Sequence, residues 1–169
     1  IFYMNKKILC SNKKIYYDYD IISRIEVGIV LFGYEVKAIK HNNVSLNGSV
    51  VYIDKYTKEA FIDNMYIDSY KYNTNNILQY NNKKDNCNNR RIRKLLIHKF
   101  EIYKLLSQIK VKGLTLVPLE VYTTFCNKKI KLLICIARGK KLYNKKEKLK
   151  KNAQMKDLNR EFKDFSSQI

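Results

Sequence analysis

The stretch LTLVPLEVYT, residues 114–123, decides the fold class together with KKIKLLICIA at residues 128–137. Both stretches are rich in β-branched and apolar residues, which is typical of strands. The short connection through Cys126 and Asn127 predicts a β-hairpin. Pro118 has no backbone N–H to donate, so it indicates an edge or a bulge in the first strand.

Further strand patterns lie upstream of this hairpin. Residues 15–21 alternate in polarity, and a buried strand is expected to end in residues 29–32, before Gly33. Residues 44–54 and 59–66 predict a second hairpin, with a polar loop at 54–58. Between these strands, residues 34–41 predict a short helix with Val36 and Ile39 facing inward.

The spacing changes to a helical period in residues 90–112. We expect one long helix there that ends near Gly113, which stands where a C-cap belongs. Its apolar face is made of Leu95, Ile102, Leu105, Leu106 and Ile109. Residues 73–89 are dominated by asparagine, which predicts a disordered loop or an insertion.

Five or six strands, one long helix and one short helix predict a mainly β fold with flanking helices. A small antiparallel β-barrel with the helices packed outside it is the economical arrangement, and a barrel of the oligonucleotide-binding type has a suitable size. Spacing alone does not separate it from other small barrels. We expect a basic N-terminal arm at 1–14, a barrel domain at 15–138 and a basic tail at 139–169.

The net charge of +19 indicates an acidic partner, with nucleic acid first and an anionic membrane surface second. Heavy use of Asn, Lys, Ile and Tyr indicates an AT-rich coding sequence, which accounts for part of the lysine excess. No apolar run approaches the roughly 20 residues of a membrane span. The four cysteines lack C-x-x-C spacing, so they predict free thiols in a reducing compartment and neither a zinc site nor a cofactor.

The tail begins with GKKLYNKKEKLKK at residues 139–151, which holds seven lysines against one glutamate. Apolar residues continue beyond it at helical spacing, including Leu158 and Phe162. We expect this tail to be unfolded when free and helical against a polyanion. A solvated lysine tail with no function is the alternative.

The sequence offers little for catalysis. His98 and Glu101 could form an acid–base pair but read better as surface residues of the long helix, and Asp18 with Asp20 lacks a metal or nucleophile. The pattern therefore predicts a protein that is not an enzyme.

RNA binding fits better. Asn12, Lys13 and Lys14 precede Tyr16, Tyr17 and Tyr19, and lysines beside aromatic rings suit phosphates and unpaired bases. A second basic cluster stands at the expected start of the long helix; it is made of Arg90, Arg91, Arg93 and Lys94. Cations at a helix N-terminus are unfavourable, which hints at an external anion. Core-facing tyrosines and a flexible leader are the alternatives.

Several blocks, in this order, resemble the SmpB family, the SsrA-binding proteins that bind tmRNA. The blocks are NKK at 12–14, EVGIVLFGYEVKAIK at 26–40, EAFI at 59–62, RIRKLLIH at 91–98, KGLTLVPL at 112–119 and ARGKK at 137–141. The resemblance runs from about residue 12 to residue 162. The combination of GYEVK with RKLLIH is the specific part.

The resemblance implies an oligonucleotide-binding-like barrel that binds the tRNA-like end of tmRNA and brings it to stalled ribosomes for trans-translation, with elongation factor Tu as an indirect partner. It assigns a tmRNA surface to Asn12, Lys13, Lys14, Glu26, Leu96 and His98, and we add Arg91, Arg93 and Lys94 of the basic cluster to this surface. It assigns contacts with the decoding site and the mRNA channel of the small ribosomal subunit to Gly139, Lys140, Lys141, Tyr143, Asn144, Lys145 and Lys146.

The chain departs from the family pattern in three tail residues and one body residue. Tyr143, Asn144 and Lys146 stand where the family has histidine, aspartate and arginine, and Tyr34 stands where tryptophan is common. Lysine lacks the planar grip of arginine on phosphate, so the decoding-site contacts are the least secure transfer.

Composition and family together suggest a nucleus-encoded protein sent to a plastid or apicoplast stroma, and otherwise a cytoplasmic one, with no membrane partner. A structural ribosomal protein or a general RNA chaperone with a similar barrel is the rival interpretation.

Overall fold

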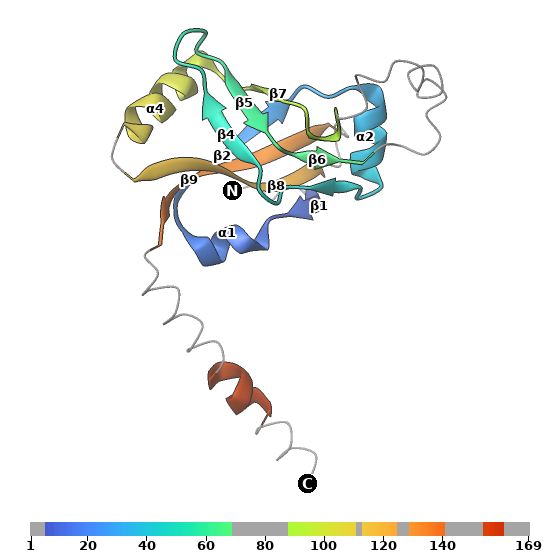
Figure 1. The fold of residues 1–169 in the computed structure, drawn as a ribbon, viewed down its shortest axis with the longest axis vertical. Coiled ribbons are helices and arrows are strands. Elements are labelled where there is room, and N and C mark those ends of the chain that lie inside the picture. Colours follow the sequence, from blue (N-terminus) through green and yellow to red (C-terminus); the bar gives the residue numbers. More distant parts are fainter. Residues whose placement is uncertain (1–5, 69–87, 111–112, 125–128, 141–153, 161–169) are drawn as a thin grey trace.

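The computed structural model describes residues 6–68, 88–110, 113–124, 129–140 and 154–160. Seven of the described strands form one antiparallel sheet in the order β1-β8-β4-β5-β7-β2-β9 (Figure 1). The strands of this sheet are β1 (Lys6–Ser11), β2 (Tyr19–Ile29), β4 (Val50–Ile53), β5 (Ala60–Asp63), β7 (Arg93–Leu96), β8 (Leu114–Thr124) and β9 (Ile130–Gly139). A small second sheet pairs β3 (Val44–Ser45) with β6 (Tyr66–Ile67).

The sheet curls because β9, at one end of the strand order, also pairs with β8, which stands next to β1 at the other end. The contact between β4 and β8 is short and consists of the pair Val51 and Leu116. The main core lies inside and includes Ile62, Leu105, Leu132, Ile134 and Ile136. The predicted mainly β, oligonucleotide-binding-like fold is confirmed.

The helices lie around this sheet. They are α1 (Lys13–Asp18), α2 (Gly33–Lys40) and α4 (Lys99–Ile109), with a 3-10 turn η1 (Asn88–Arg90). The short helix expected at 34–41 is confirmed as α2, with Ala38 and Ile39 buried. Figure 1 shows α2 and α4 at opposite ends of the sheet and α1 beneath it.

The expectation of a strand at 15–21 was wrong in its first half, because residues 13–18 form α1 and β2 begins at Tyr19. Ile15 is buried in a second apolar cluster against Val117, Leu119 and Cys135 on β8 and β9. Covering this outer patch of the sheet favours the helix, so packing overrides the strand propensity of the tyrosines.

The expected N-terminal arm was also wrong for residues 6–14. Residues 6–11 form β1, which pairs with β8 from Lys6 opposite Thr124 to Ser11 opposite Glu120. The buried strand expected to reach residue 32 ends at Ile29, and Phe32 beyond it is 52% exposed.

The long helix expected at 90–112 is not present as one element. Residues 93–96 form β7, which pairs with β5 and β2, and α4 begins only at Lys99. Arg93 and Leu95 are buried while Lys94 and Leu96 are exposed, which is the period of a strand. Leu95 was predicted on the apolar face of the long helix, but it is buried as a residue of strand β7. Gly113 has a φ of +87°, which glycine adopts readily.

The two predicted hairpins are present with changed boundaries. β8 and β9 pair antiparallel, and their register shifts between Pro118 and Glu120, which confirms the bulge. β4 and β5 form the second hairpin, whereas the strand expected at 44–54 is divided into β3 and β4. The turn through Cys126 and Asn127 lies outside the described residues.

Two other predictions fall largely on residues that the structure does not describe. Most of the asparagine-rich stretch lies outside the described residues, although its end forms part of η1. In the tail, residues 154–160 are helical and all exposed, including Met155 at 62% and Leu158 at 50%. The helical spacing of the tail is therefore confirmed over these residues, and its expected change from unfolded to helical on a polyanion stays a prediction.

Candidate nucleic-acid interface

Glu35 joins the two sequence blocks that carried the resemblance. It lies on α2 with a 2% exposed side chain, and it accepts hydrogen bonds from Nε and Nη2 of Arg91 at 2.9 and 2.5 Å. Nε of Arg93 donates to the same carboxylate at 2.9 Å. The backbone N–H of Phe32 donates to it at 2.8 Å and closes the first turn of α2.

The Arg93 side chain is completely buried, and all three of its nitrogen atoms donate hydrogen bonds within the protein. Its Nη1 also donates to the carbonyls of Met65 at 2.7 Å and Arg91 at 3.0 Å. Burial by itself acts to raise the pKa of the Glu35 carboxyl, but the hydrogen bonds from Arg91 and Phe32 and the charge of Arg93 outweigh it and leave the pKa lowered. Glu35 is therefore ionised, and Arg93 holds the fold together.

This network corrects the predicted tmRNA surface. Arg93 has no side-chain surface left for RNA. Arg91 is 19% exposed and lies over the Phe32 ring at 4.2 Å, so only its edge is accessible. Both residues were expected at a helix N-terminus with an external anion, whereas the anion that they bind is the carboxylate of Glu35.

The other side of β7 faces solvent. Leu96 is 56% exposed, and Lys94 is exposed and paired with Glu59 of the β4–β5 hairpin. Leu96 is paired with Gly28 on β2. A Cβ on Gly28 would lie 3.0 Å from the Leu96 Cβ, so glycine lets these two strands carry Leu96 close against β2.

Glu26 and His98 flank this pair. Glu26 stands two residues before Gly28 on β2, and His98 stands two residues after Leu96 on the antiparallel chain, so both belong to the same end of the two strands. His98 is exposed at the N-terminus of α4, where its N–H donates to Glu101 at 3.2 Å. His98 and Glu101, which read better as helix-surface residues than as an acid–base pair, thus cap the N-terminus of α4.

Glu26 is bound by cations on both sides. It pairs with Lys6 of β1 and lies 3.6 Å from Lys131 of β9. Burial by itself would raise the pKa of Glu26, but the contacts led by Lys6 have the larger effect and leave this pKa below its ordinary value. The carboxylate therefore stays charged. Sequence reasoning missed Lys6 because only the curled sheet brings β1 to β2.

The predicted NKK group lies elsewhere. Asn12 is buried, and its amide donates to the Leu46 carbonyl at 3.1 Å, so it positions the chain before α1. Lys13 and Lys14 are exposed on α1, beside the start of β2 rather than the end that carries Glu26. The structure therefore separates these lysines from Leu96 and His98 along β2.

Lys140 is the last residue described before the basic tail. Its N–H donates to the Asp18 carbonyl at 3.0 Å, and its amino group binds the Tyr16 carbonyl and Asp20, each at 3.2 Å. These carbonyls belong to the last turn of α1, where a cation is favourable. Lys140 thus fastens the tail to the body. Gly139 ends β9, and the predicted tail residues Lys141, Tyr143, Asn144, Lys145 and Lys146 lie outside the described residues.

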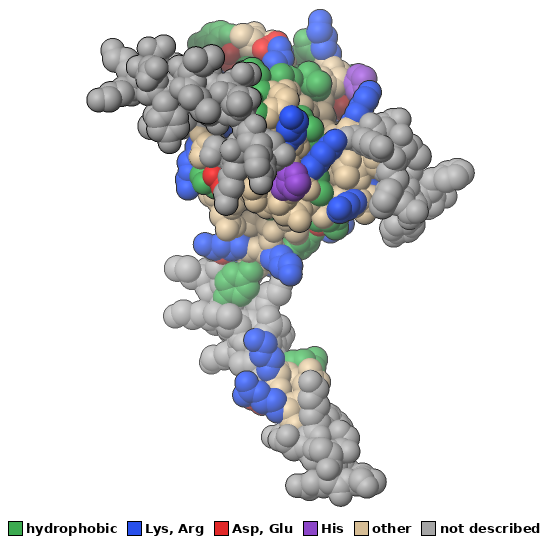
Figure 2. Space-filling model, turned by 90° about the vertical axis from the view of Figure 1, so that its right-hand side faces the viewer, with side chains coloured by type: hydrophobic (Ala, Val, Ile, Leu, Met, Phe, Trp, Pro, Cys, Tyr) green, Lys and Arg blue, Asp and Glu red, His purple; other side chains and the backbone are tan. Residues whose placement is uncertain are grey.

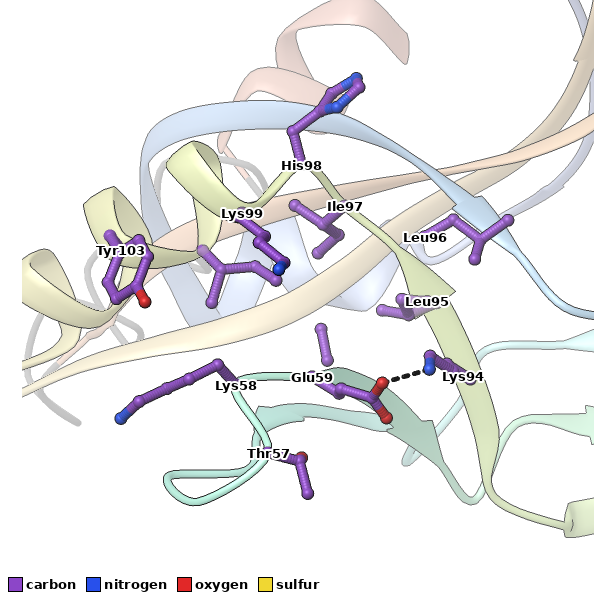
Figure 3. A pocket seen from close by; sticks show the side chains of 12 residues that line it. Thr57, Lys58, Glu59, Lys94, Leu95, Leu96, Ile97, His98, Lys99 and Tyr103 are labelled. Atoms are coloured by element: carbon purple, nitrogen blue, oxygen red, sulfur yellow. Dashed lines mark hydrogen bonds and ion pairs between the residues drawn. The ribbon is translucent and has the colours of Figure 1, made fainter.

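Beside β7 there is a hollow of about 500 Å³, which we call the α4 hollow (Figure 3). Its walls come from the β4–β5 turn, β7 and the first turns of α4. It is lined by Thr57, Lys58, Glu59, Ala60, Lys94, Leu95, Leu96, Ile97, His98, Lys99, Ile102 and Tyr103. Sequence reasoning missed Lys58, Lys99 and Tyr103, since no pattern links a turn lysine to a helix 40 residues away.

The described residues hold no group of His, Cys, Asp and Glu side chains that could bind a metal ion. Among the same residues, no helix is long and apolar enough to cross a membrane. Figure 2 shows one face of the molecule on which Lys and Arg side chains outnumber Asp and Glu. Such a surface suits a polyanion such as RNA.

Comparison with known proteins agrees with this geometry. The family model described as SmpB protein matches residues 9–164. An SsrA-binding protein of Persephonella marina is 42% identical over 95% of this chain and 97% of its own length. The SsrA-binding protein of Syntrophobacter fumaroxidans is 37% identical over 91% and 88%.

A solved structure supports the same relationship. It is described as "tmRNA-SmpB: a journey to the center of the bacterial ribosome", and one of its chains is 36% identical with a TM-score of 0.59. The similarity covers 78% of this chain and 84% of that one. Sequence blocks, fold and relatives agree, and the chain belongs to the SmpB protein family.

Proposed function

We propose that this protein binds the tRNA-like part of tmRNA and delivers it to stalled ribosomes for trans-translation. The observation that carries the proposal is the exposed end of β2 and β7, where Leu96 and His98 lie beside Glu26 on a strongly basic molecule. Relatives named SsrA-binding proteins and a chain from a tmRNA–SmpB structure support it.

The body and the tail have separate tasks in this proposal. The body, residues 15–138 with β1, binds folded RNA by shape and phosphate contacts, with Lys13 and Lys14 as a second contact region. The tail from residue 139 enters the decoding site and the mRNA channel of the small subunit. Delivery involves elongation factor Tu indirectly.

The protein acts by binding and needs no catalytic group in this role. We place it in a bacterial-type translation compartment. The Asn-, Lys- and Ile-rich composition supports an organelle stroma of the plastid type as the finer assignment.

A competition experiment tests the proposal. Labelled tmRNA is bound to the full chain, and unlabelled tmRNA or unrelated tRNA is added in increasing amounts. We expect tmRNA to compete at much lower concentration, with the log of the affinity falling by roughly 0.7–0.9 per phosphate contact against log salt. Equal competition by tRNA would favour a general RNA chaperone or a ribosomal protein instead.

A further inference from the structure

The α4 hollow combines positive charge with an apolar floor. Its rim carries Lys58, Lys94 and Lys99, whereas Glu59 is the single carboxylate among the lining residues and is already paired with Lys94 (Figure 3). The remaining charge of Lys58 and Lys99 favours an anionic ligand. Figure 3 shows these two lysines on opposite sides, Lys99 on α4 and Lys58 on the β4–β5 turn.

The floor of the hollow excludes some simple ligands. Ala60, Leu95 and Ile102 are buried there, and the Tyr103 ring stands beside them with 60% of its surface exposed. A small inorganic anion would gain nothing from apolar side chains or from an exposed ring. A ligand with both a phosphate and a flat ring makes use of all of these groups.

The backbone at Lys58 provides a second, independent observation. Among the described residues, three that are not glycine have a positive φ: Asn42 at 62°, Asn64 at 57° and Lys58 at 56°. Asparagine tolerates this left-handed region well, whereas lysine does not. A strained conformation of this kind persists where the surroundings enforce it and is typical of functional positions.

The turn that holds Lys58 in this conformation is organised around Asp54. The Asp54 carboxylate accepts hydrogen bonds from the Tyr56 N–H and the Thr57 hydroxyl, both at 2.9 Å. The Lys58 N–H donates to the Asp54 carbonyl at 3.1 Å, and the Asp54 N–H donates to the Glu59 carbonyl at 2.9 Å. These hydrogen bonds hold residue 58 at the rim of the hollow in a left-handed conformation that asparagine would adopt with less strain than lysine.

We propose that the α4 hollow binds one unpaired nucleotide of the RNA, with its phosphate on Lys58 and Lys99 and its base over the apolar floor beside Tyr103. This inference rests on the proposed function and extends it. Leu96 and His98 line the same hollow, so the RNA surface continues from β7 onto α4 and the β4–β5 turn.

The first test replaces the strained lysine by the residue that its backbone prefers. In Lys58→Asn we expect an unchanged or higher Tm, because asparagine relieves the left-handed strain. The same variant should bind tmRNA several-fold more weakly, and its salt slope should fall by roughly 1 because one phosphate contact is lost. A merely structural role for Lys58 would not lower the slope while the Tm holds.

The second test removes the stacking surface and includes a matched control. Tyr103→Leu keeps an apolar side chain on α4 and should weaken the binding of a 12-nucleotide single-stranded RNA roughly tenfold. Lys104→Gln removes a lysine from the exposed neighbouring position of α4 and should change binding less than Lys58→Asn. Equal losses in these two lysine variants would show a general charge effect and overturn the subsite.

The outcomes separate the two proposals. If the wild-type chain prefers tmRNA to tRNA but Lys58→Asn and Tyr103→Leu keep its affinity and salt slope, the subsite is overturned and the proposed function stands. If the wild type shows no preference for tmRNA, the proposed function fails, and the single-stranded RNA alone decides the subsite. Loss of ribosome binding in these variants with unchanged binding of tmRNA and of the single-stranded RNA would place the occupant of the hollow on the ribosome and would also overturn the subsite.

Discussion

The inner and outer sides of β7 bear similar residue types but differ in their surroundings. On the inner side, Arg93 is buried and every contact that it makes is with the protein itself. On the outer side, Leu96 keeps 56% of its surface exposed although it is apolar. The comparison teaches that a charged residue, Arg93, stabilises the fold, whereas an apolar residue, Leu96, is left available for a partner.

The strongest way to break this comparison is to remove Arg93. Arg93→Met leaves the Glu35 carboxylate buried with only Arg91 as its cation, and we expect a loss of about 3–5 kcal/mol in the free energy of unfolding. Urea denaturation followed by circular dichroism measures it. Arg91→Met is the matched control and should lose less, because Arg93 still pairs with Glu35.

A double substitution sharpens the result. Glu35→Leu combined with Arg93→Met removes both charges together, so much of the stability should return. A loss in Arg93→Met no larger than in Arg91→Met would contradict the assignment of Arg93 as the structural partner.

Acid should produce the next largest effect. The folded pKa of Glu35 is lowered, so its contribution to stability is full above the ordinary carboxyl pKa and is lost as the pH falls through the folded value. Urea midpoints between pH 7 and pH 3 should therefore decline less steeply in Glu35→Gln than in the wild type. Glu26→Gln is the control, and its curve should stay nearer to that of the wild type because Glu26 is 39% exposed. Parallel curves for Glu35→Gln and the wild type would contradict this account.

The outer side is tested by Leu96→Ser. Since Leu96 is more than half exposed, the free energy of unfolding should change by only about 0.5 kcal/mol, whereas tmRNA affinity should fall about tenfold, or about 1.4 kcal/mol. Ile92→Ser, at a residue that is 51% exposed just before β7, is the matched control and should keep its affinity. A large stability loss in Leu96→Ser would mean that both sides of β7 are structural.

The smallest expected effect concerns the root of the tail. Lys140→Gln removes a cation from the end of α1 and should lower the free energy of unfolding by about 0.3–1 kcal/mol. Thermal unfolding at low and high salt measures it, and the difference from the wild type should shrink at high salt. Lys104→Gln, on the surface of α4, provides the control. Equal losses in the two variants would show that Lys140 has no capping role.

The sequence by itself determined the class of fold and the family. Runs of β-branched and apolar residues with short connections predicted the β8–β9 and β4–β5 hairpins, and helical spacing after Gly33 predicted α2. These elements depend on neighbours in the chain, so periodicity and turn residues are enough to find them. The order of the sequence blocks predicted the SmpB family, and the family model over residues 9–164 confirms this prediction.

Only the tertiary structure decided which residues of those blocks are available to a partner. Arg93 reads as a surface cation until α2 brings Glu35 beside it. Residues 15–18 read as the start of a strand until β8 and β9 offer Ile15 an apolar patch. The α4 hollow exists because the β4–β5 turn and α4 meet, although 40 residues separate Lys58 from Lys99 at the start of α4. Burial and charge pairing depend on contacts distant in sequence, and local patterns carry no information about such contacts.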